Sequence, residues 1–261
     1  MCGIVGYVGG QDATQVVVEG LRRLEYRGYD SAGVAVVTPV GVQSRKRAGK
    51  LANLEKALAE APLPDTTVGI GHTRWATHGA PNDVNAHPHL SEDGSLAVIH
   101  NGIIENFAEL RSLLQADGVT FLSETDTEVA AHLLAKMVGE TGSLTQAMQA
   151  TCRQLRGAFT LVAASAEDPD TLVGARRNSP LVVGLGEGET FLASDVSAFI
   201  AHTRRAMELG QDQVITITRE GVEVTDFDGV PADGVEYEVT WDASAAEKAG
   251  YDLFMLKEIA E

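Results

Sequence analysis

The sequence lacks the features of secreted, membrane-spanning and nucleic-acid-binding proteins. Two cysteines among 261 residues cannot build a disulfide framework. No apolar run approaches the roughly 18 residues of a membrane span, and the N-terminus lacks both the cationic flank and the long apolar core of a signal peptide. Basic residues are scarce, because 20 Lys and Arg stand against 37 Asp and Glu, which gives a net charge of −17. Such a surface repels phosphate backbones and anionic lipids. We therefore expect no nucleic-acid partner, no membrane and a cytoplasmic location.

The chain is long enough to fold around a large hydrophobic core without disulfides or structural metal ions. Area scaling predicts that about 70% of the surface of a chain of this size is buried on folding. The 27 glycines and 8 prolines are an ordinary share, which excludes collagenous and low-complexity chains. One large domain or two small ones would account for this length.

The hydrophobic pattern predicts an α+β protein. Short runs rich in valine and isoleucine predict strands at 4–8, 33–37, 68–71, 96–100, 159–164, 181–185 and 214–218. Helical spacing predicts helices at about 13–26 and 103–116, and two more that open at the capping boxes 125–128 and 143–146. Strands and helices do not alternate strictly. We therefore expect antiparallel sheet with helices stacked outside it.

The composition changes near the C-terminus, where we expect the domain to end. A turn-rich acidic segment at 226–234 closes the globular part, and residues 241–250 have the composition of a linker. Residues 251–261 form an apolar helical pattern without a cap. We expect a domain at 2–240, followed at 241–261 by the start of a connection into a longer natural chain.

The two cysteines have different contexts. Cys152 shares helical spacing with Leu144, Met148 and Leu155, which predicts a buried core thiol. Cys2 directly follows Met1. Removal of Met1 would leave the Cys2 thiol beside its own α-amine, whose ordinary pKa of about 7.7–8.0 suits a general base. The alternative for Cys2 is a plain first residue of a strand.

A nucleophile that transfers an acyl group needs donors for the developing oxyanion. Asn101-Gly102 follows a predicted strand and precedes a helix expected at Ile103. The Asn101 amide and the Gly102 N–H would suit that task. The alternative is a helix cap or an Asn-Gly turn.

A Gly-bounded loop at 71–79 carries further candidates. Arg74 can bind a carboxylate through its bidentate fork, and Trp75 is either a lid over a small ligand or a packing anchor. Thr77 and His78 can supply polar contacts. Nearby, the spacing of His87 and His89 fits no strong zinc signature, so we expect no metal.

Asp126 opens a predicted helix. Its ordinary role would be to stabilise the positive helix end. Its functional role would be to hold a substrate ammonium group. Together, Arg74 and Asp126 could recognise the two charges of an α-amino acid.

Taken together, these segments resemble one family. The start at 1–7 resembles class II (N-terminal nucleophile) glutamine amidotransferases. Within that class, the chain resembles the glutaminase domain of the glutamine–fructose-6-phosphate aminotransferases (isomerizing) over essentially its whole length. The segments that carry this narrower resemblance are 21–33, 72–79, 100–106 and 123–128.

The resemblance implies a four-layer αββα fold with two stacked antiparallel sheets and no cofactor. Cys2 would attack the glutamine side-chain amide, release ammonia and form a thioester that water hydrolyses to glutamate. Asn101 and Gly102 would form the oxyanion hole, and Arg27 would orient the N-terminal residue. Arg74 would bind the substrate carboxylate, and Asp126 and the Gly102 backbone would hold the amino group. Thr77 and His78 would line the same loop as Arg74, and Trp75 would lie on the mobile loop that closes over glutamine.

The resemblance also concerns partners. Its family members continue into sugar-phosphate isomerase domains, which use the ammonia to make glucosamine 6-phosphate, and 257–259 resembles their junction. We expect the full-length protein to be a homodimer. Two alternatives remain open: the glutaminase half of another class II amidotransferase, such as the phosphoribosyl-pyrophosphate enzyme or asparagine synthetase, or a catalytically silent glutamine-binding regulatory module.

Overall fold

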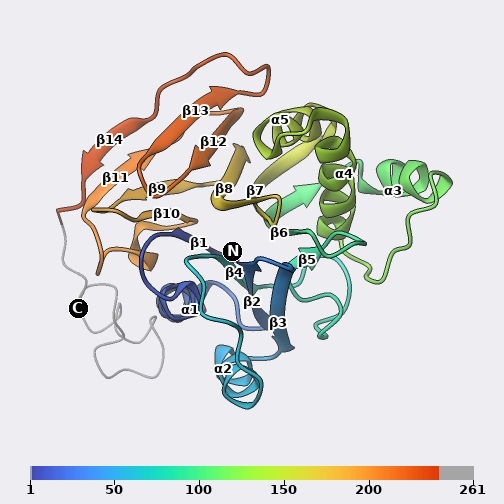
Figure 1. Cartoon of the computed structure of the whole chain (residues 1–261). Coiled ribbons are helices and arrows are strands. Elements are labelled where there is room, and N and C mark those ends of the chain that lie inside the picture. The colour runs from blue at the N-terminus through green and yellow to red at the C-terminus, as the bar shows by residue number, and fades with distance from the viewer. Residues whose placement is uncertain (1, 241–261) are drawn as a thin grey trace, which may run out of the picture.

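Two antiparallel β-sheets form the centre of the molecule (Figure 1). The structure is a computed structural model that describes residues 2–240. The larger sheet contains, in spatial order, β14 (Val235–Glu238), β11 (Arg205–Glu208), β9 (Val182–Leu185), β10 (Thr190–Ala193), β1 (Gly3–Val8), β4 (Val68–Arg74), β2 (Ser31–Thr38) and β3 (Gly41–Ala48). The smaller sheet contains β13 (Val222–Asp226), β12 (Gln213–Ile217), β8 (Asp168–Arg177), β7 (Gly157–Ser165), β6 (Leu96–Ile104) and β5 (His89–Leu90).

Helices cover the outer faces of both sheets (Figure 1). The helices α1 (Ala13–Leu24) and α2 (Leu51–Glu60) pack on the larger sheet. On the smaller sheet lie α4 (Asp126–Thr141) and α5 (Leu144–Gln154), with α3 (Phe107–Ala116) beside α4. Two short 3-10 helices, η1 (Glu25–Arg27) and η2 (Val196–Ala198), complete the elements. The order helix, sheet, sheet, helix is the expected αββα arrangement.

Three hydrophobic cores fill the three interfaces between these layers. The middle core lies between the sheets and joins Ile70 of β4 to Ile99 of β6. A second core packs Leu21 of α1 on the larger sheet. The third packs Leu133 of α4 on the smaller sheet. Each sheet is therefore buried on both faces, which explains why its central strands are continuous apolar runs.

The alternation of side chains along β6 directs consecutive residues to different layers. Ala97 and Ile99 belong to the core between the sheets, whereas Val98 belongs to the core beneath the helices. Asn101 continues the first series, so it faces the larger sheet. His100 continues the second series and contacts Thr127 of α4.

Most of the expected elements are confirmed. All seven predicted strands are present, as are helices at the four predicted places. Thr125 and Ser143 both cap helices, because their hydroxyls accept hydrogen bonds from Glu128 N and Gln146 N. Cys152 is completely buried in the third core, as its spacing predicts.

Two helix boundaries are wrong in the sequence-based prediction. The first helix ends at Leu24 rather than Tyr26, and the chain continues as the 3-10 turn η1. The second was expected to begin at Ile103, but β6 continues to Ile104 and α3 begins at Phe107. The reason is pairing: residues 101–104 continue the ladder with β7, and those hydrogen bonds outweigh the local preference of Asn-Gly for a turn or cap.

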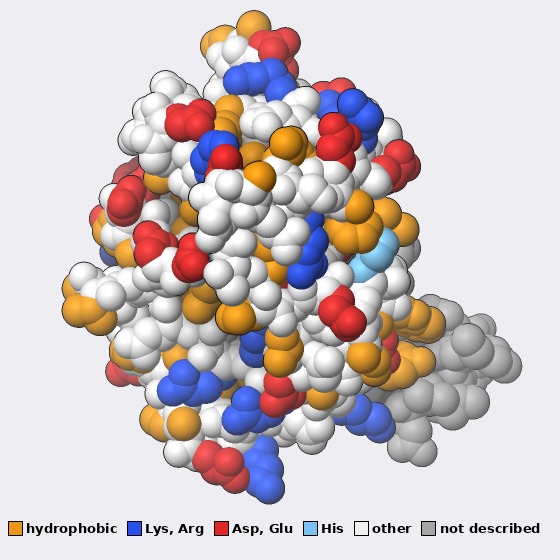
Figure 2. All heavy atoms as spheres, turned by 90° about the vertical axis from the view of Figure 1, so that its right-hand side faces the viewer, with side chains coloured by type: hydrophobic (Ala, Val, Ile, Leu, Met, Phe, Trp, Pro, Cys, Tyr) orange, Lys and Arg blue, Asp and Glu red, His pale blue; other side chains and the backbone are white. Residues whose placement is uncertain are grey.

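Met1, the predicted linker at 241–250 and the predicted terminal helix at 251–261 lie outside the described residues. Within 2–240, no helix combines the length and the apolar character that crossing a bilayer requires. Figure 2 shows the face that includes the right-hand side of Figure 1, where acidic and basic side chains are interspersed. On that face acidic side chains lie beside the basic ones, also near the lower end of the view, where several basic side chains gather.

Candidate active site

A cavity of about 410 Å³ opens where β1, β4 and β6 approach one end of the sandwich. Predicted site residues from distant parts of the chain line it together. They are Cys2, Arg27, Arg74, Trp75, Thr77, Asn101, Gly102 and Asp126. The sequence-based prediction therefore identified residues that the fold brings to one place.

The pairing of β1 with β4 places Cys2 beside Arg74. Ile4 lies opposite His72 in this ladder, so the next positions outward on the same face are Cys2 and Arg74. The Trp75 N–H donates a hydrogen bond to Cys2 Sγ at 3.1 Å. Burial raises the pKa of the Cys2 thiol above its ordinary value, and the Trp75 bond offsets only part of that effect. The thiol is thus protonated at neutral pH and needs a base before it can attack.

Asn101 and Gly102 lie within β6, at the edge of the cavity. The Asn101 side chain donates from Nδ2 to the carbonyl oxygen of Cys2 at 2.9 Å. Gly102 has a φ of +117°, and a Cβ at this position would overlap the carbonyl oxygen of Ala158. Only glycine fits this conformation and this close approach of β7. The residues that carry two possible donors, a side-chain amide and a backbone N–H, therefore line the same cavity as the thiol.

Arg74 is a buried cation held by backbone oxygens. Its guanidinium donates to the carbonyls of His78, Gly79 and Ala80. Among residues 2–240, no carboxylate lies within ion-pair distance of it. Burial lowers the pKa of Arg74, and the more distant charge of Asp126 raises it. A cation that is buried and lacks an adjacent counter-ion is suited to bind an anionic ligand.

Asp126 is the first residue of α4 and is 3% exposed. Its Oδ2 accepts a hydrogen bond from Ile104 N at 3.0 Å and lies 3.8 Å from His100 Nδ1. Burial lowers the pKa of His100, so this ring is neutral at physiological pH. Among the described residues, the Asp126 carboxylate therefore has no paired cation, and it can accept a substrate ammonium group.

Arg27 occupies the turn η1 at the mouth of the cavity. It forms an ion pair with Asp195, and its guanidinium lies 5.5 Å from the ring centre of Tyr26. Asp195 was not singled out from the sequence. This ion pair holds Arg27 at the wall of the cavity that Cys2 also lines. The orienting role of Arg27 stays a prediction.

The loop after β4 carries three predicted residues in different surroundings. Trp75 is 48% exposed, and its ring centre lies 5.5 Å from that of Tyr29. Thr77 lines the cavity. His78 is not among the lining residues; its ring packs edge-on against Phe107 at 5.1 Å. The substrate-contact role of His78 stays a prediction that needs a loop rearrangement.

Other cavity residues were not predicted. His87, His100 and Thr127 line the inner part, and one wall is formed by 178–180. Asn178 has a positive φ of 53°, and Thr160 Oγ1 donates to Pro180 O at 3.1 Å. The Asn-Ser-Pro sequence indicates a turn, but only the pairing of β7 with β8 shows which site this turn borders.

The two histidines considered for zinc, His87 and His89, lie close together, and His87 lines the cavity. His87 Nδ1 is 3.1 Å from His72 Nδ1, and the rings of His87 and His89 form a T-shaped pair with their centres 5.1 Å apart. Within the described part of the chain, no group of three or more His, Cys, Asp or Glu side chains is arranged to hold a metal ion. The expected absence of a metal stays a prediction.

Two proteins of known name are similar to this chain over its whole length. Glutamine–fructose-6-phosphate aminotransferase (isomerizing) from Streptomyces coelicolor is 67% identical over 261 residues, which cover 100% of this chain and 42% of that protein. The protein of the same name from Leifsonia xyli is 61% identical over 262 residues, with 100% and 42% covered. The chain thus spans less than half the length of these relatives.

A solved structure and a family model agree with these relatives. The glutamine phosphoribosylpyrophosphate amidotransferase from B. subtilis superposes with a TM-score of 0.73 at 26% identity, covering 87% of this chain and 49% of that one. The expected α+β fold with two antiparallel sheets is thereby confirmed. The model of the glutamine amidotransferase domain matches residues 59–232. With its sheets, its thiol and its paired donors in one cavity, the chain belongs to the glutamine amidotransferase domain family.

Proposed function

We propose that this domain hydrolyses L-glutamine to L-glutamate and ammonia, with Cys2 as the nucleophile once Met1 is removed. One observation carries the proposal: the thiol, the donors at Asn101 and Gly102, the cation of Arg74 and the anion of Asp126 converge in one cavity. The cavity thus offers a nucleophile, an oxyanion site and two charged groups of the signs that a zwitterionic amino acid needs.

The first half of the reaction forms a thioester. The α-amine of processed Cys2 takes the thiol proton, directly or through a water, as sulfur attacks the side-chain carbonyl carbon. The tetrahedral oxyanion accepts hydrogen bonds from Asn101 Nδ2 and Gly102 N. When it collapses, the carbon–nitrogen bond breaks, and the α-ammonium returns the proton to the leaving nitrogen, which departs as ammonia.

The second half consumes the thioester. Water loses a proton to the same α-amine and attacks the thioester carbonyl, and the two donors again bind the oxyanion. The carbon–sulfur bond then breaks, glutamate forms, and the thiolate of Cys2 recovers its proton. No metal or cofactor takes part in this sequence.

The charged groups select the substrate. Arg74 binds the α-carboxylate of glutamine, and Asp126 with the Gly102 backbone binds the α-amino group. Thr77 and His78 contribute from the same loop, which carries Trp75 over the bound substrate. Arg27 orients the N-terminal residue through its position beside Asp195.

The domain serves a longer protein in this proposal. Residues 2–240 form the glutaminase domain, and 241–261 begin the connection to sugar-phosphate isomerase domains. There the ammonia converts fructose 6-phosphate to glucosamine 6-phosphate in the cytoplasm. The high identity to proteins named for that reaction supports this assignment. Sedimentation of the full-length protein tests the homodimer that we also propose.

Intact mass spectrometry after incubation with a glutamine-mimicking electrophile tests the nucleophile. We expect a single adduct on a chain that has lost Met1. Ammonia release from glutamine should be measurable and should disappear in Cys2→Ala. Glutamine binding without turnover would favour the silent regulatory module. An acceptor assay on the full-length protein separates fructose 6-phosphate from the acceptors of other class II enzymes.

A further inference from the structure

A chain of buried histidines lies behind the oxyanion site. His72 Nε2 is 2.9 Å from Asn101 Oδ1, and His72 Nδ1 is 3.1 Å from His87 Nδ1. The rings of His87 and His89 form a T-shaped pair, and His89 Nε2 is 3.0 Å from Thr125 Oγ1, the cap of α4. None of these histidines has a part in the reaction steps above.

The partners of His72 determine where its proton lies. The carbonyl oxygen of Cys2 can only accept, so it faces Asn101 Nδ2, and Asn101 Oδ1 faces His72. Because Oδ1 can only accept, His72 Nε2 must carry the hydrogen. Burial lowers the pKa of His72 to about 3, so the ring is neutral and its Nδ1 is a bare acceptor. The hydrogen between the two rings therefore belongs to His87 Nδ1, which donates to His72.

This arrangement fixes the orientation of the Asn101 amide. With Oδ1 bound to His72, Nδ2 points to Cys2, where it donates to the carbonyl oxygen at 2.9 Å. A flipped amide would place Oδ1 against that carbonyl oxygen, two acceptors in contact. Nδ2 carries two hydrogens, so one remains for an oxyanion while the other holds Cys2 O.

We propose that His72 is a positioning residue for the glutaminase reaction: its Nε2–H holds Oδ1 of Asn101, so that Nδ2 faces the reacting carbonyl oxygen. His87 supports it by fixing the tautomer of His72. This inference rests on the proposed function. It adds a role for a side chain that is 0% exposed and that reaches the substrate only through Asn101.

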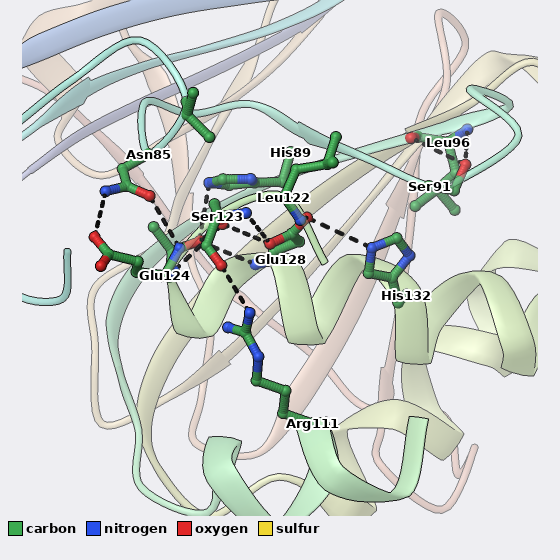
Figure 3. Close-up of polar contacts among 12 residues, drawn as sticks. Asn85, His89, Ser91, Leu96, Arg111, Leu122, Ser123, Glu124, Glu128 and His132 are labelled. Atoms are coloured by element: carbon green, nitrogen blue, oxygen red, sulfur yellow. Dashed lines mark hydrogen bonds and ion pairs between the residues drawn. The ribbon is translucent and has the colours of Figure 1, made fainter. Parts of the chain in front are cut away.

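The row of buried histidines also connects the oxyanion site to the first turn of α4. Figure 3 shows His89 above this turn, close to Ser123 and Glu128. Because Asp126 begins the same turn, one buried array supports the donor side of the cavity and the side that we assign to the amino group. His89 belongs to this support, whereas His72 alone contacts Asn101.

Two substitutions at His72 separate the Nε2 donor from the volume of the ring. Gln places an amide nitrogen as many bonds from the backbone as Nε2, whereas Asn places it at the position of Nδ1. We expect His72→Gln to keep kcat within about threefold of the original chain. His72→Asn should lower kcat about 10- to 100-fold, less than the complete loss of an oxyanion donor, with little change in KM or in glutamate binding. His202→Gln, outside the cavity, is the matched control and should leave both constants unchanged.

A double-mutant cycle distinguishes positioning from a general structural role. If His72 acts through Asn101, His72→Asn should cost less than about threefold in an Asn101→Ala background. An equal cost in both backgrounds, or full kcat in His72→Asn, would overturn the inference. Thermal unfolding of each variant checks that it is folded, and His72→Gln keeps the test informative if His72→Asn is not.

Nitrogen NMR of the histidine rings tests the geometry without turnover. We expect His72 as the neutral Nε2–H tautomer and His87 as the Nδ1–H tautomer at pH 7. The opposite tautomer of His72 would contradict the inference even if the protein is fully active. If the unsubstituted protein folds with these tautomers but releases no ammonia, the proposed function is refuted instead.

Discussion

The side-chain amide of Asn101 is hydrogen bonded to the main-chain carbonyl of Cys2 at 2.9 Å, although 99 positions separate the two residues. The bond joins the smaller sheet to the first residue before β1 of the larger sheet. It thereby sets the distance between the proposed nucleophile and the proposed oxyanion donor before substrate arrives. Preorganised donors of this kind contribute most to acyl-transfer catalysis.

Replacing Asn101 should therefore affect the chemical step more than binding. Asn101→Ala is expected to lower kcat for ammonia release about 10²- to 10³-fold, the usual cost of one oxyanion donor. KM should change little, because in the proposed function Arg74 and Asp126 hold the ground-state glutamine. Steady-state kinetics checks both constants, and a rise in KM at unchanged kcat would refute the assignment.

Gly102→Ala should destabilise the fold. The φ of +117° strains any other residue, and the added Cβ would overlap the carbonyl oxygen of Ala158. We expect the free energy of unfolding to fall by about 3 kcal/mol or more, measured by urea denaturation. Gly118→Ala is the control, because Gly118 also has a positive φ of +95° but open space around its Cβ position. It should cost about 1 kcal/mol, and equal costs would contradict the steric argument.

Arg74→Ala should weaken glutamine binding. A charged hydrogen-bonded contact contributes about 1.5–3 kcal/mol, which corresponds to about a 10- to 150-fold rise in Kd. Calorimetric titration of glutamate into each variant measures this directly. Arg22→Ala removes an exposed arginine that pairs with Glu55, and it should bind like the original chain. Unchanged affinity in Arg74→Ala would show that another group binds the carboxylate.

Glu128 should make stability depend on acid pH. Burial tends to raise the pKa of its carboxyl group. The nearby His132 ring and the hydrogen bonds from Ser123 and Leu122 have the opposite effect (Figure 3). Together they outweigh burial and lower the pKa to about 2. Because the folded pKa lies below the ordinary 4.5, the stabilisation is present above about pH 4.5 and is lost as pH falls through about 2.

Urea denaturation of Glu128→Gln between pH 7 and pH 2 measures this contribution. The variant should be less stable than the original chain at pH 7, and the difference should shrink towards pH 2. Glu60→Gln, at the exposed end of α2, serves as the control and should follow the original chain. A difference that stays constant over the whole range would contradict the lowered pKa.

Local sequence signals predicted seven strands and missed both edge and interior strands. The strands that were found are apolar runs rich in valine and isoleucine, whereas β3 contains the basic cluster 45–47 because it lies at the edge of its sheet. The interior strands β8 and β10 were also missed. Helix α2 was missed because Lys50 precedes it and supplies no side-chain cap. Asn101 and Gly102 were assigned to a junction because their local preference disagrees with the ladder that holds them.

The residues of the candidate site were predicted better than the residues that hold them in place. Cys2, Arg74 and Asp126 have residue types and positions that indicate chemistry on their own. The contacts of Arg27 with Asp195, and of His72 with Asn101, join residues that are 168 and 29 positions apart. Such contacts depend on which strands pair and in what register, which local pattern does not determine.

The pairing of β1 with β4 has a consequence for substrate length. His72 and Arg74 are two residues apart on one face of β4, so the backbone separates them by about 7 Å. In the proposed function Arg74 holds the α-carboxylate of glutamine and His72 acts through Asn101 on the side-chain amide, so the strand fixes the spacing of these two supports. Asparagine is one methylene shorter than glutamine, and we therefore expect it to be a poorer substrate, because its amide would stop short of the oxyanion donors when Arg74 holds its carboxylate.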